Sequence, residues 1–247
     1  MDKKVVLTYY HTGMKDKWHH VEEVGTKIAD PNEFNTLYNS VHGRGYDFVT
    51  LANELAPDKP DWIVAKMDGE LAKPEGMSLY VHKFIACYKW LLKHPEYEEI
   101  WIVDSRDTEM LGEPMPEDGH IYTGYDAYFP QFRRWVNFIW FLGGFIDGVW
   151  NVRNFGVGQR HGDIEEIYLR NVHSEDIPYN CGVFGGKRKD VMEFLKDYTD
   201  RLAVNDITLE MVPFNYLCYT KYKDKTEVCT TRMTMLEKDY TKWWRHK

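Results

Sequence analysis

The stretch Glu99-Ile100-Trp101-Ile102-Val103, which runs directly into Asp104-Ser105-Arg106-Asp107, decides the expected fold. A mostly apolar run of this length that ends in charged residues is typical of a buried strand. Residues 78–94 before it carry apolar side chains at helical spacing, and Pro95 ends that pattern. A helix that leads into a buried strand indicates a parallel sheet, with ligand sites at the carboxyl ends of its strands.

The same alternation of strands and helices continues on both sides of this stretch. Strands are predicted at residues 3–10, 46–51 and 182–184, and helices at 33–42 and 189–202. We therefore expect an α/β, Rossmann-like fold with a mainly parallel sheet flanked by helices, in a single domain over residues 1–247. Residues 113–178 are glycine-rich and aromatic and break the alternation, so they are predicted to form an insertion over one face of the sheet.

The composition excludes several classes of protein. The 247 residues are 43% hydrophobic and 15% aromatic, which is incompatible with a disordered chain. The net charge of −8 argues against a protein that coats nucleic acid over its whole surface. The longest apolar stretch, 136–150, is shorter than the roughly 20 residues that span a bilayer. The four dispersed cysteines form no CxxC pair, so we expect free thiols in a cytoplasmic protein without integral membrane contact.

Asp104 and Asp107 are the first candidates for a metal site, because they follow the buried strand directly. Mg2+ and Mn2+ prefer carboxylate oxygens and bridge to phosphates. Arg106 stands between the two carboxylates and has the guanidinium geometry to hold a carboxylate or a phosphate by paired hydrogen bonds. The alternative is a structural turn at the strand end in which the aspartate acts as a cap.

The segment Asn180 to Gly186 contains paired glycines after the short predicted strand. Glycines permit the backbone to approach a ligand closely, although a tight turn explains them equally well. Asp206 and Glu210 are four residues apart and share one face if their segment is helical. The segment Trp243-Trp244-Arg245-His246-Lys247 should bury at least one tryptophan, and such burial brings His246 towards Asp104 and Asp107.

Taken in order, four motifs resemble those of GT-A-fold glycosyltransferases that use nucleotide sugars, such as glycogenin-like and related small enzymes. The motifs are Asp104 to Asp107, Asn180 to Gly186, Glu210 to Asn215, and His246-Lys247. The resemblance covers most of the chain outside the predicted insertion. The sequence departs from the family in spacing its aspartates as Asp-x-x-Asp and in having Glu210 in place of an aspartate.

The resemblance implies a role for each matching residue. Mn2+ or Mg2+ would be bound by Asp104, Asp107 and His246, and would clamp the diphosphate of a UDP- or GDP-linked sugar. Glu210, or Asp206 as its rival, would be the catalytic carboxylate. The donor would be held by Thr8, Tyr10 and His11 in a loop after the first strand, and by Lys83, Asp104, Arg106, Asn180, Gly182, Gly185 and Lys247.

Other functions and several acceptors stay open at the level of sequence. A non-catalytic nucleotide- or sugar-binding module of the same fold and a nucleotidyltransferase are the alternatives. The acceptor is a glycan, a protein, a lipid-linked sugar or a modified DNA base. The clusters Arg133-Arg134-Trp135 and Lys242 to Arg245 combine basic and aromatic residues in a way that suits DNA.

Overall fold

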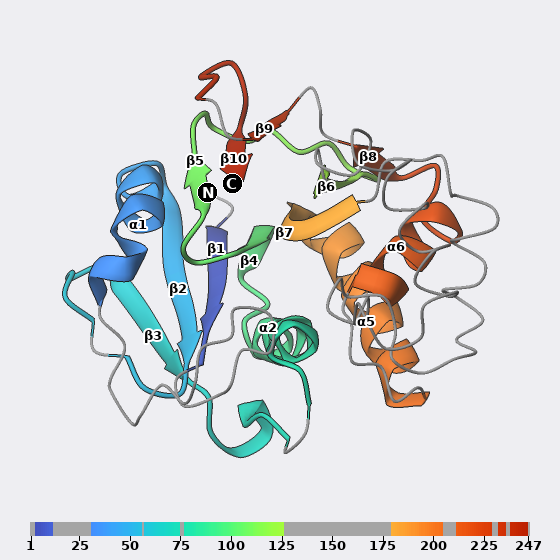
Figure 1. Ribbon diagram of the computed structural model, residues 1–247, viewed down its shortest axis with the longest axis horizontal. Helices are drawn as coiled ribbons and strands as arrows, with labels where there is room; N and C mark the ends of the chain where they lie inside the picture. Colours follow the sequence, from blue (N-terminus) through green and yellow to red (C-terminus); the bar gives the residue numbers. More distant parts are fainter. Residues whose placement is uncertain are drawn as a thin grey trace, which may run out of the picture.

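The computed structural model describes residues 3–11, 31–55, 57–74, 77–125, 179–204, 211–228, 232–235 and 238–246. A seven-stranded sheet forms its centre (Figure 1). From one edge to the other, its strands are β3 (Trp62–Lys66), β2 (Tyr46–Ala52), β1 (Lys3–Tyr10), β4 (Tyr97–Val103), β7 (Tyr179–Lys187), β6 (Ile121–Tyr125) and β8 (Thr226–Val228). A smaller sheet has the order β5 (Thr108–Met110), β10 (Trp244–His246), β9 (Met233–Met235).

The central sheet is mostly parallel, as predicted. Strands β3, β2, β1 and β4 pair in parallel, and β6 pairs with β8 in parallel. Strand β7 runs antiparallel to both of its neighbours, β4 and β6. The described chain is therefore an α/β protein with a mixed, mainly parallel sheet.

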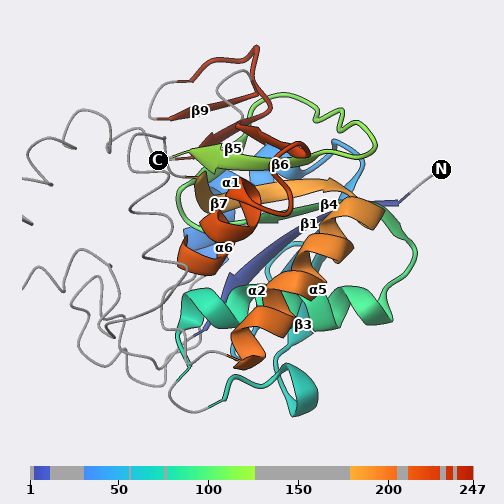
Figure 2. The ribbon, with the colours of Figure 1, turned by 90° about the vertical axis from the view of Figure 1, so that its right-hand side faces the viewer.

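Each face of the sheet has its own apolar core. One core packs side chains such as Phe84, Phe194 and Phe214 from the helices α2 (Leu79–Lys93), α5 (Arg188–Val204) and α6 (Met211–Tyr219) against the strands. Figure 2 shows α2 and α5 lying together on this face. The opposite core includes Leu37 of α1 (Asn35–Val41), together with Trp244 of the small sheet. The short turns η1 (Pro31–Phe34) and η2 (Gly69–Leu71) complete the described helices.

The order of the strands identifies the place at their carboxyl ends where a ligand is expected to bind. From β1, the chain continues to β2 and β3 on one side, whereas β4 lies on the other side of β1. In open α/β sheets, ligands bind outside the carboxyl ends of the strands where the order reverses in this way. Tyr10 ends β1 and Asp104 follows β4, so both lie at this switch point.

Most elements agree with their predictions, and two do not. The predicted strand at 182–184 is longer, because pairing with β4 and β6 extends β7 from Tyr179 to Lys187. Residues 121–125, assigned to the insertion, instead form β6 in the central sheet. Residues 126–178 lie outside the described residues.

The described cysteines Cys87, Cys181 and Cys218 are buried free thiols, as predicted. Within the described ranges, no helix combines the length and apolar character needed to cross a membrane.

Candidate metal centre

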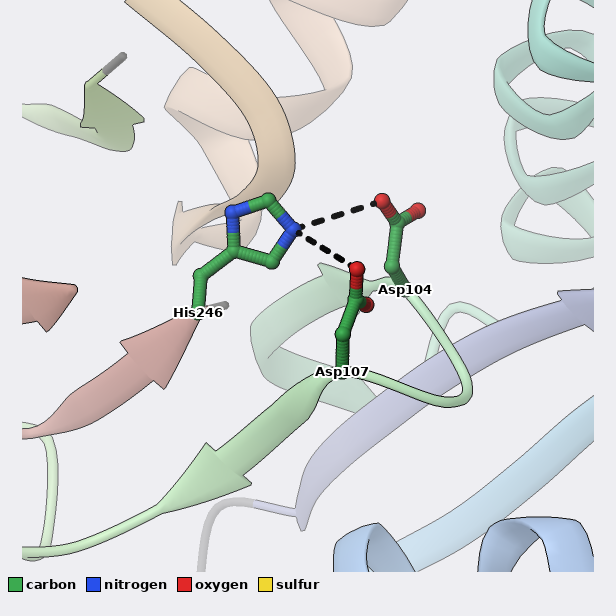
Figure 3. A group of neighbouring side chains, drawn as sticks. All are labelled: Asp104, Asp107 and His246. Carbon is green, nitrogen blue, oxygen red and sulfur yellow. Dashed lines mark ion pairs between the residues drawn. The ribbon is translucent and has the colours of Figure 1, made fainter. Parts of the chain in front are cut away.

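Asp104, Asp107 and His246 come together from three elements (Figure 3). Asp104 follows β4, Asp107 precedes β5, and His246 belongs to β10. His246 Nε2 lies 3.6 Å from Asp104 Oδ2 and 3.6 Å from Asp107 Oδ2. Within the described residues, these three form the group of carboxylate and imidazole side chains able to hold one ion.

Strand pairing brings His246 to this position. Strand β10 runs antiparallel to β5, with His246 opposite Thr108, the residue after Asp107. Trp244 is fully buried and its ring lies 5.5 Å from that of Trp101 in β4, between ring centroids. Both expected features are present: Trp244 is buried, and His246 lies beside the two aspartates.

The three side chains fit a divalent cation. Their nearest ligand atoms all lie within 4.8 Å of one another, close enough for one ion to contact all three. His246 is 8% exposed, and neither of its ring nitrogens has a hydrogen-bond partner among the described residues. A separation of 3.6 Å is too long for a good hydrogen bond, so the carboxylates do not satisfy Nε2. Two carboxylate oxygens and one imidazole nitrogen are a donor set that suits Mn2+, with Mg2+ favoured by the oxygens alone.

Lys83 neutralises one of the two carboxylates. Its Nζ lies 2.7 Å from Asp104 Oδ1 and donates to the carbonyl oxygen of Cys181 at 3.2 Å. The Lys83 side chain is only 6% exposed. Lys83 was predicted to face the donor; in the structure its Nζ contacts the candidate metal ligand Asp104.

The charges of this cluster shift two pKa values in opposite directions. Burial alone would raise the pKa of Asp104, but Lys83 and His246 outweigh it and lower the pKa to about 2. Burial alone would lower the pKa of His246, but the carboxylates of Asp104 and Asp107 outweigh it and raise the pKa to about 9. Without metal at neutral pH, His246 is therefore protonated and holds the place of a cation between the carboxylates.

Gly182 of β7 leaves the space that His246 occupies. A Cβ atom at this position would lie 2.4 Å from His246 Nε2 and 2.9 Å from Asp104 Oδ2. The carbonyl oxygen of Gly182 also accepts a hydrogen bond of 2.8 Å from the backbone N–H of Asp104. The backbone at Gly182 therefore does approach another group closely, as expected of a glycine here. That group is the imidazole of His246.

The other residues of the Asn180 to Gly186 motif have local roles. They lie within β7 and not after a strand, which corrects their predicted position. Asn180 Oδ1 accepts a hydrogen bond of 2.7 Å from the backbone N–H of Gly182. A Cβ at Gly185 would lie 2.5 Å from the Trp101 ring, so this glycine is required by core packing.

Arg106 contacts protein groups close to the centre. Its Nη2 lies 2.6 Å from Glu33 Oε2 and donates to the hydroxyl of Tyr10 at 2.9 Å. The Tyr10 hydroxyl in turn donates to Glu33 Oε2 at 3.0 Å. These contacts tie the turn between Asp104 and Asp107 to the end of β1.

The predicted donor loop after the first strand is only partly a loop. Thr8 and Tyr10 lie in β1, because pairing with β2 on one side and β4 on the other continues through Thr8. Thr8 is fully buried, so it does not form an open nucleotide-binding surface. His11 follows the strand. Asp206, Glu210 and Lys247 lie outside the described residues.

The predicted basic and aromatic cluster at Lys242 to Arg245 is not an exposed surface. Trp243, Trp244 and Arg245 are buried, and Arg245 Nη2 lies 2.5 Å from Glu109 Oε2. Sequence reasoning missed this ion pair, because its two residues lie far apart in the chain and meet only when β5 and β10 pair. The Arg133-Arg134-Trp135 cluster lies outside the described residues.

Comparison with protein families and with curated proteins finds no relative of the chain. No protein-family model matches the chain, and no curated protein matches it. The inference of function therefore depends on the geometry of the Asp104, Asp107 and His246 centre and on its place at the switch point of the sheet.

Proposed function

We propose that this protein is a metal-dependent glycosyltransferase of GT-A type, which moves a sugar from a UDP- or GDP-linked donor to an acceptor hydroxyl. One observation carries the proposal: Asp104, Asp107 and His246 converge at the carboxyl end of β4, beside the end of β1. Nucleotides bind α/β sheets at this point. The order of the four motifs in the sequence supports the same assignment.

The charges of the centre suit a nucleoside diphosphate. A bound Mn2+ or Mg2+ would neutralise the negative charge that develops on the leaving diphosphate. Asp104, Asp107 and Lys83 together carry one net negative charge when His246 is neutral. A divalent ion held by these side chains leaves the centre positive overall, so it attracts an anionic leaving group and not a cation.

The side chains of Lys83 and Arg106 position the two aspartates. Lys83 holds Asp104 Oδ1, which leaves Oδ2 directed at His246. Arg106, anchored by Glu33 and Tyr10, fixes the turn that carries both aspartates. On the acceptor side, Glu210, with Asp206 as its rival, is the carboxylate proposed to take the proton from the acceptor hydroxyl if the reaction inverts configuration.

Calorimetric titration of UDP and GDP, with MnCl2 or with EDTA, tests the metal bridge. We expect measurable binding of one nucleotide with Mn2+ and its loss in EDTA or in Asp107→Asn. Asp200→Asn is the matched control, because Asp200 is exposed and pairs with Lys196 on the surface of α5. Nucleotide binding that is equal in EDTA contradicts the proposed role of the metal.

A donor screen then tests the reaction itself. Glycosyltransferases release sugar to water slowly when no acceptor is present, so the nucleotide that binds should yield free sugar from its nucleotide sugar with Mn2+. Metal-dependent nucleotide binding without sugar release from any donor would favour the non-catalytic binding module.

A further inference from the structure

An ion pair links the strand that carries His246 to the strand that follows Asp107. Arg245 in β10 lies directly opposite Glu109 in β5. Arg245 Nη2 and Glu109 Oε2 are 2.5 Å apart, and their side chains are only 10% and 14% exposed. Neither residue belongs to the group of candidate metal ligands.

The two faces of the small sheet carry different side chains of β10. Side chains alternate along a strand, so Trp244 and His246 point to one face and Arg245 points to the other. Trp244 packs in the core and His246 lies at the candidate metal centre. A slip of β10 by one residue along β5 would exchange these faces and turn His246 away from Asp107.

The short length of β10 makes its register a particular problem. The strand has three residues, so its ladder to β5 covers only three residue pairs. In that ladder, the central pair is Arg245 and Glu109. Opposite charges that face one another across an antiparallel pair favour one alignment over its neighbours. In the alignment that places Arg245 opposite Met110, the guanidinium loses its carboxylate.

Glu109 also contacts the chain that leads into β10. Lys238 Nζ lies 2.8 Å from Glu109 Oε1. Glu109 therefore receives one cation from β10 itself and another from the segment before it. Because Glu109 is two residues from Asp107, these contacts fix the approach of β10 close to the metal ligands.

We propose that Glu109 and Arg245 are positioning residues, whose ion pair sets the register of β10 and thereby the affinity of the centre for a divalent cation. This inference rests on the proposed metal centre of Asp104, Asp107 and His246. A buried ion pair adds little stability compared with apolar side chains of similar size, and in some proteins its contribution is to specify one alignment. The pair should therefore matter more for metal binding than for the stability of the fold.

The test is the double variant Glu109→Met with Arg245→Met, which removes both charges without leaving either buried alone. The probe is Mn2+ alone, titrated by electron paramagnetic resonance. We expect the affinity for Mn2+ to fall about tenfold, as for residues that orient metal ligands from outside the ligand shell. The melting temperature in EDTA should stay within a few degrees of the parent. Glu113→Gln is the control, because Glu113 is exposed and pairs with Lys4 away from β10, and it should leave both values unchanged.

Hydrogen exchange gives a second readout that does not depend on metal. In EDTA, amides 244–246 should exchange faster in the double variant than in the parent, because the strand leaves its register more often. Parental Mn2+ affinity and exchange in the double variant would overturn the inference. A melting temperature that falls in proportion to the affinity would also overturn it, because the pair would then be a general stabiliser.

The failure of this inference is distinct from the failure of the proposed function. If Asp107→Asn and His246→Gln keep parental Mn2+ affinity, the proposed metal centre is wrong. If those two variants lose Mn2+ while the double variant keeps it and its parental exchange, only the positioning role of Glu109 and Arg245 is wrong.

Discussion

The backbone of Gly182 and the imidazole of His246 are in such close contact that no side chain fits between them. A Cβ at position 182 would lie 2.4 Å from both Cε1 and Nε2 of His246. The contact joins β7 of the central sheet to β10 of the small sheet. Gly182 thus belongs to the candidate metal centre, although it offers no ligand atom of its own.

Gly182→Ala should weaken Mn2+ binding by more than tenfold, because the added methyl group displaces His246 from the two carboxylates. Overpacking of this kind costs about 1–3 kcal/mol of stability, so the fold should persist. Mn2+ titration beside thermal unfolding in EDTA checks both expectations. Unchanged Mn2+ affinity would show that His246 reaches the ion by a different route from the one described.

The sequence predicted the elements whose signals are local. The apolar spacing of α2, the alternation in β2 and the apolar runs of β1 and β4 all come from residues close in the chain. The length of β7 was not predictable in this way, because pairing with β4 and β6 extends it. Strand β6 was hidden for the same reason: its five residues pair with the distant strands β7 and β8.

In the candidate site too, some features follow from the local sequence and others depend on contacts between distant parts of the chain. Asp104 and Asp107 could be predicted because they follow a recognisable strand, and His246 because two adjacent tryptophans required burial. The pairing of Lys83 with Asp104 joins a helix to a strand end, and nothing in the local sequence indicates it. Arg106 was predicted to contact a ligand, but its choice of Glu33 depends on where η1 lies.

The two aspartates should differ in what they contribute to stability. Asp104 neutralises the buried Lys83, whereas Asp107 is 42% exposed and pairs with His246. Asp104→Asn should therefore cost about 2 kcal/mol of unfolding free energy in EDTA, and Asp107→Asn less than about 1 kcal/mol. Urea denaturation measures both values.

A double variant that also replaces Lys83 is the control for this difference in stability. If Lys83 is the cause, Lys83→Met combined with Asp104→Asn should cost less than the sum of the two single variants. Additive costs would show that Asp104 stabilises the fold through other contacts, such as its backbone bond to Gly182.

Trp244 and His246 should separate stability from metal binding, although both lie in β10. Trp244→Ala removes a fully buried ring from the core and should cost about 3–5 kcal/mol. His246→Gln removes a metal ligand and should abolish Mn2+ binding. In EDTA at pH 9, where the proton on His246 contributes little stability, this variant should change the melting temperature much less than Trp244→Ala does. Calorimetric unfolding with and without Mn2+ gives both results, since a bound ion raises the melting temperature only if it binds the folded state. An equal rise for the parent and for His246→Gln would contradict the role of His246.

The proton on His246 should compete with the metal. The pKa of His246 is raised from 6.5 to about 9 by the two carboxylates, so below pH 9 the imidazole must release a proton before its Nε2 can bind an ion. The affinity for Mn2+ should therefore rise by about tenfold for each pH unit between pH 6 and pH 8. Titrations in buffers with different ionisation enthalpies should show close to one proton released for each ion bound.

The same shift makes the metal-free protein less stable in alkali. A raised histidine pKa stabilises the folded state fully below the pKa of 6.5 in the unfolded chain, and this contribution disappears as the pH rises through about 9. In EDTA, the free energy of unfolding should fall by up to about 3 kcal/mol between pH 6.5 and pH 9, and the fall should be absent in His246→Gln. Saturating Mn2+ should reverse it, because the ion replaces the proton between Asp104 and Asp107. A free energy of unfolding that is constant from pH 6.5 to pH 9 in EDTA would mean that His246 is not charged between the carboxylates.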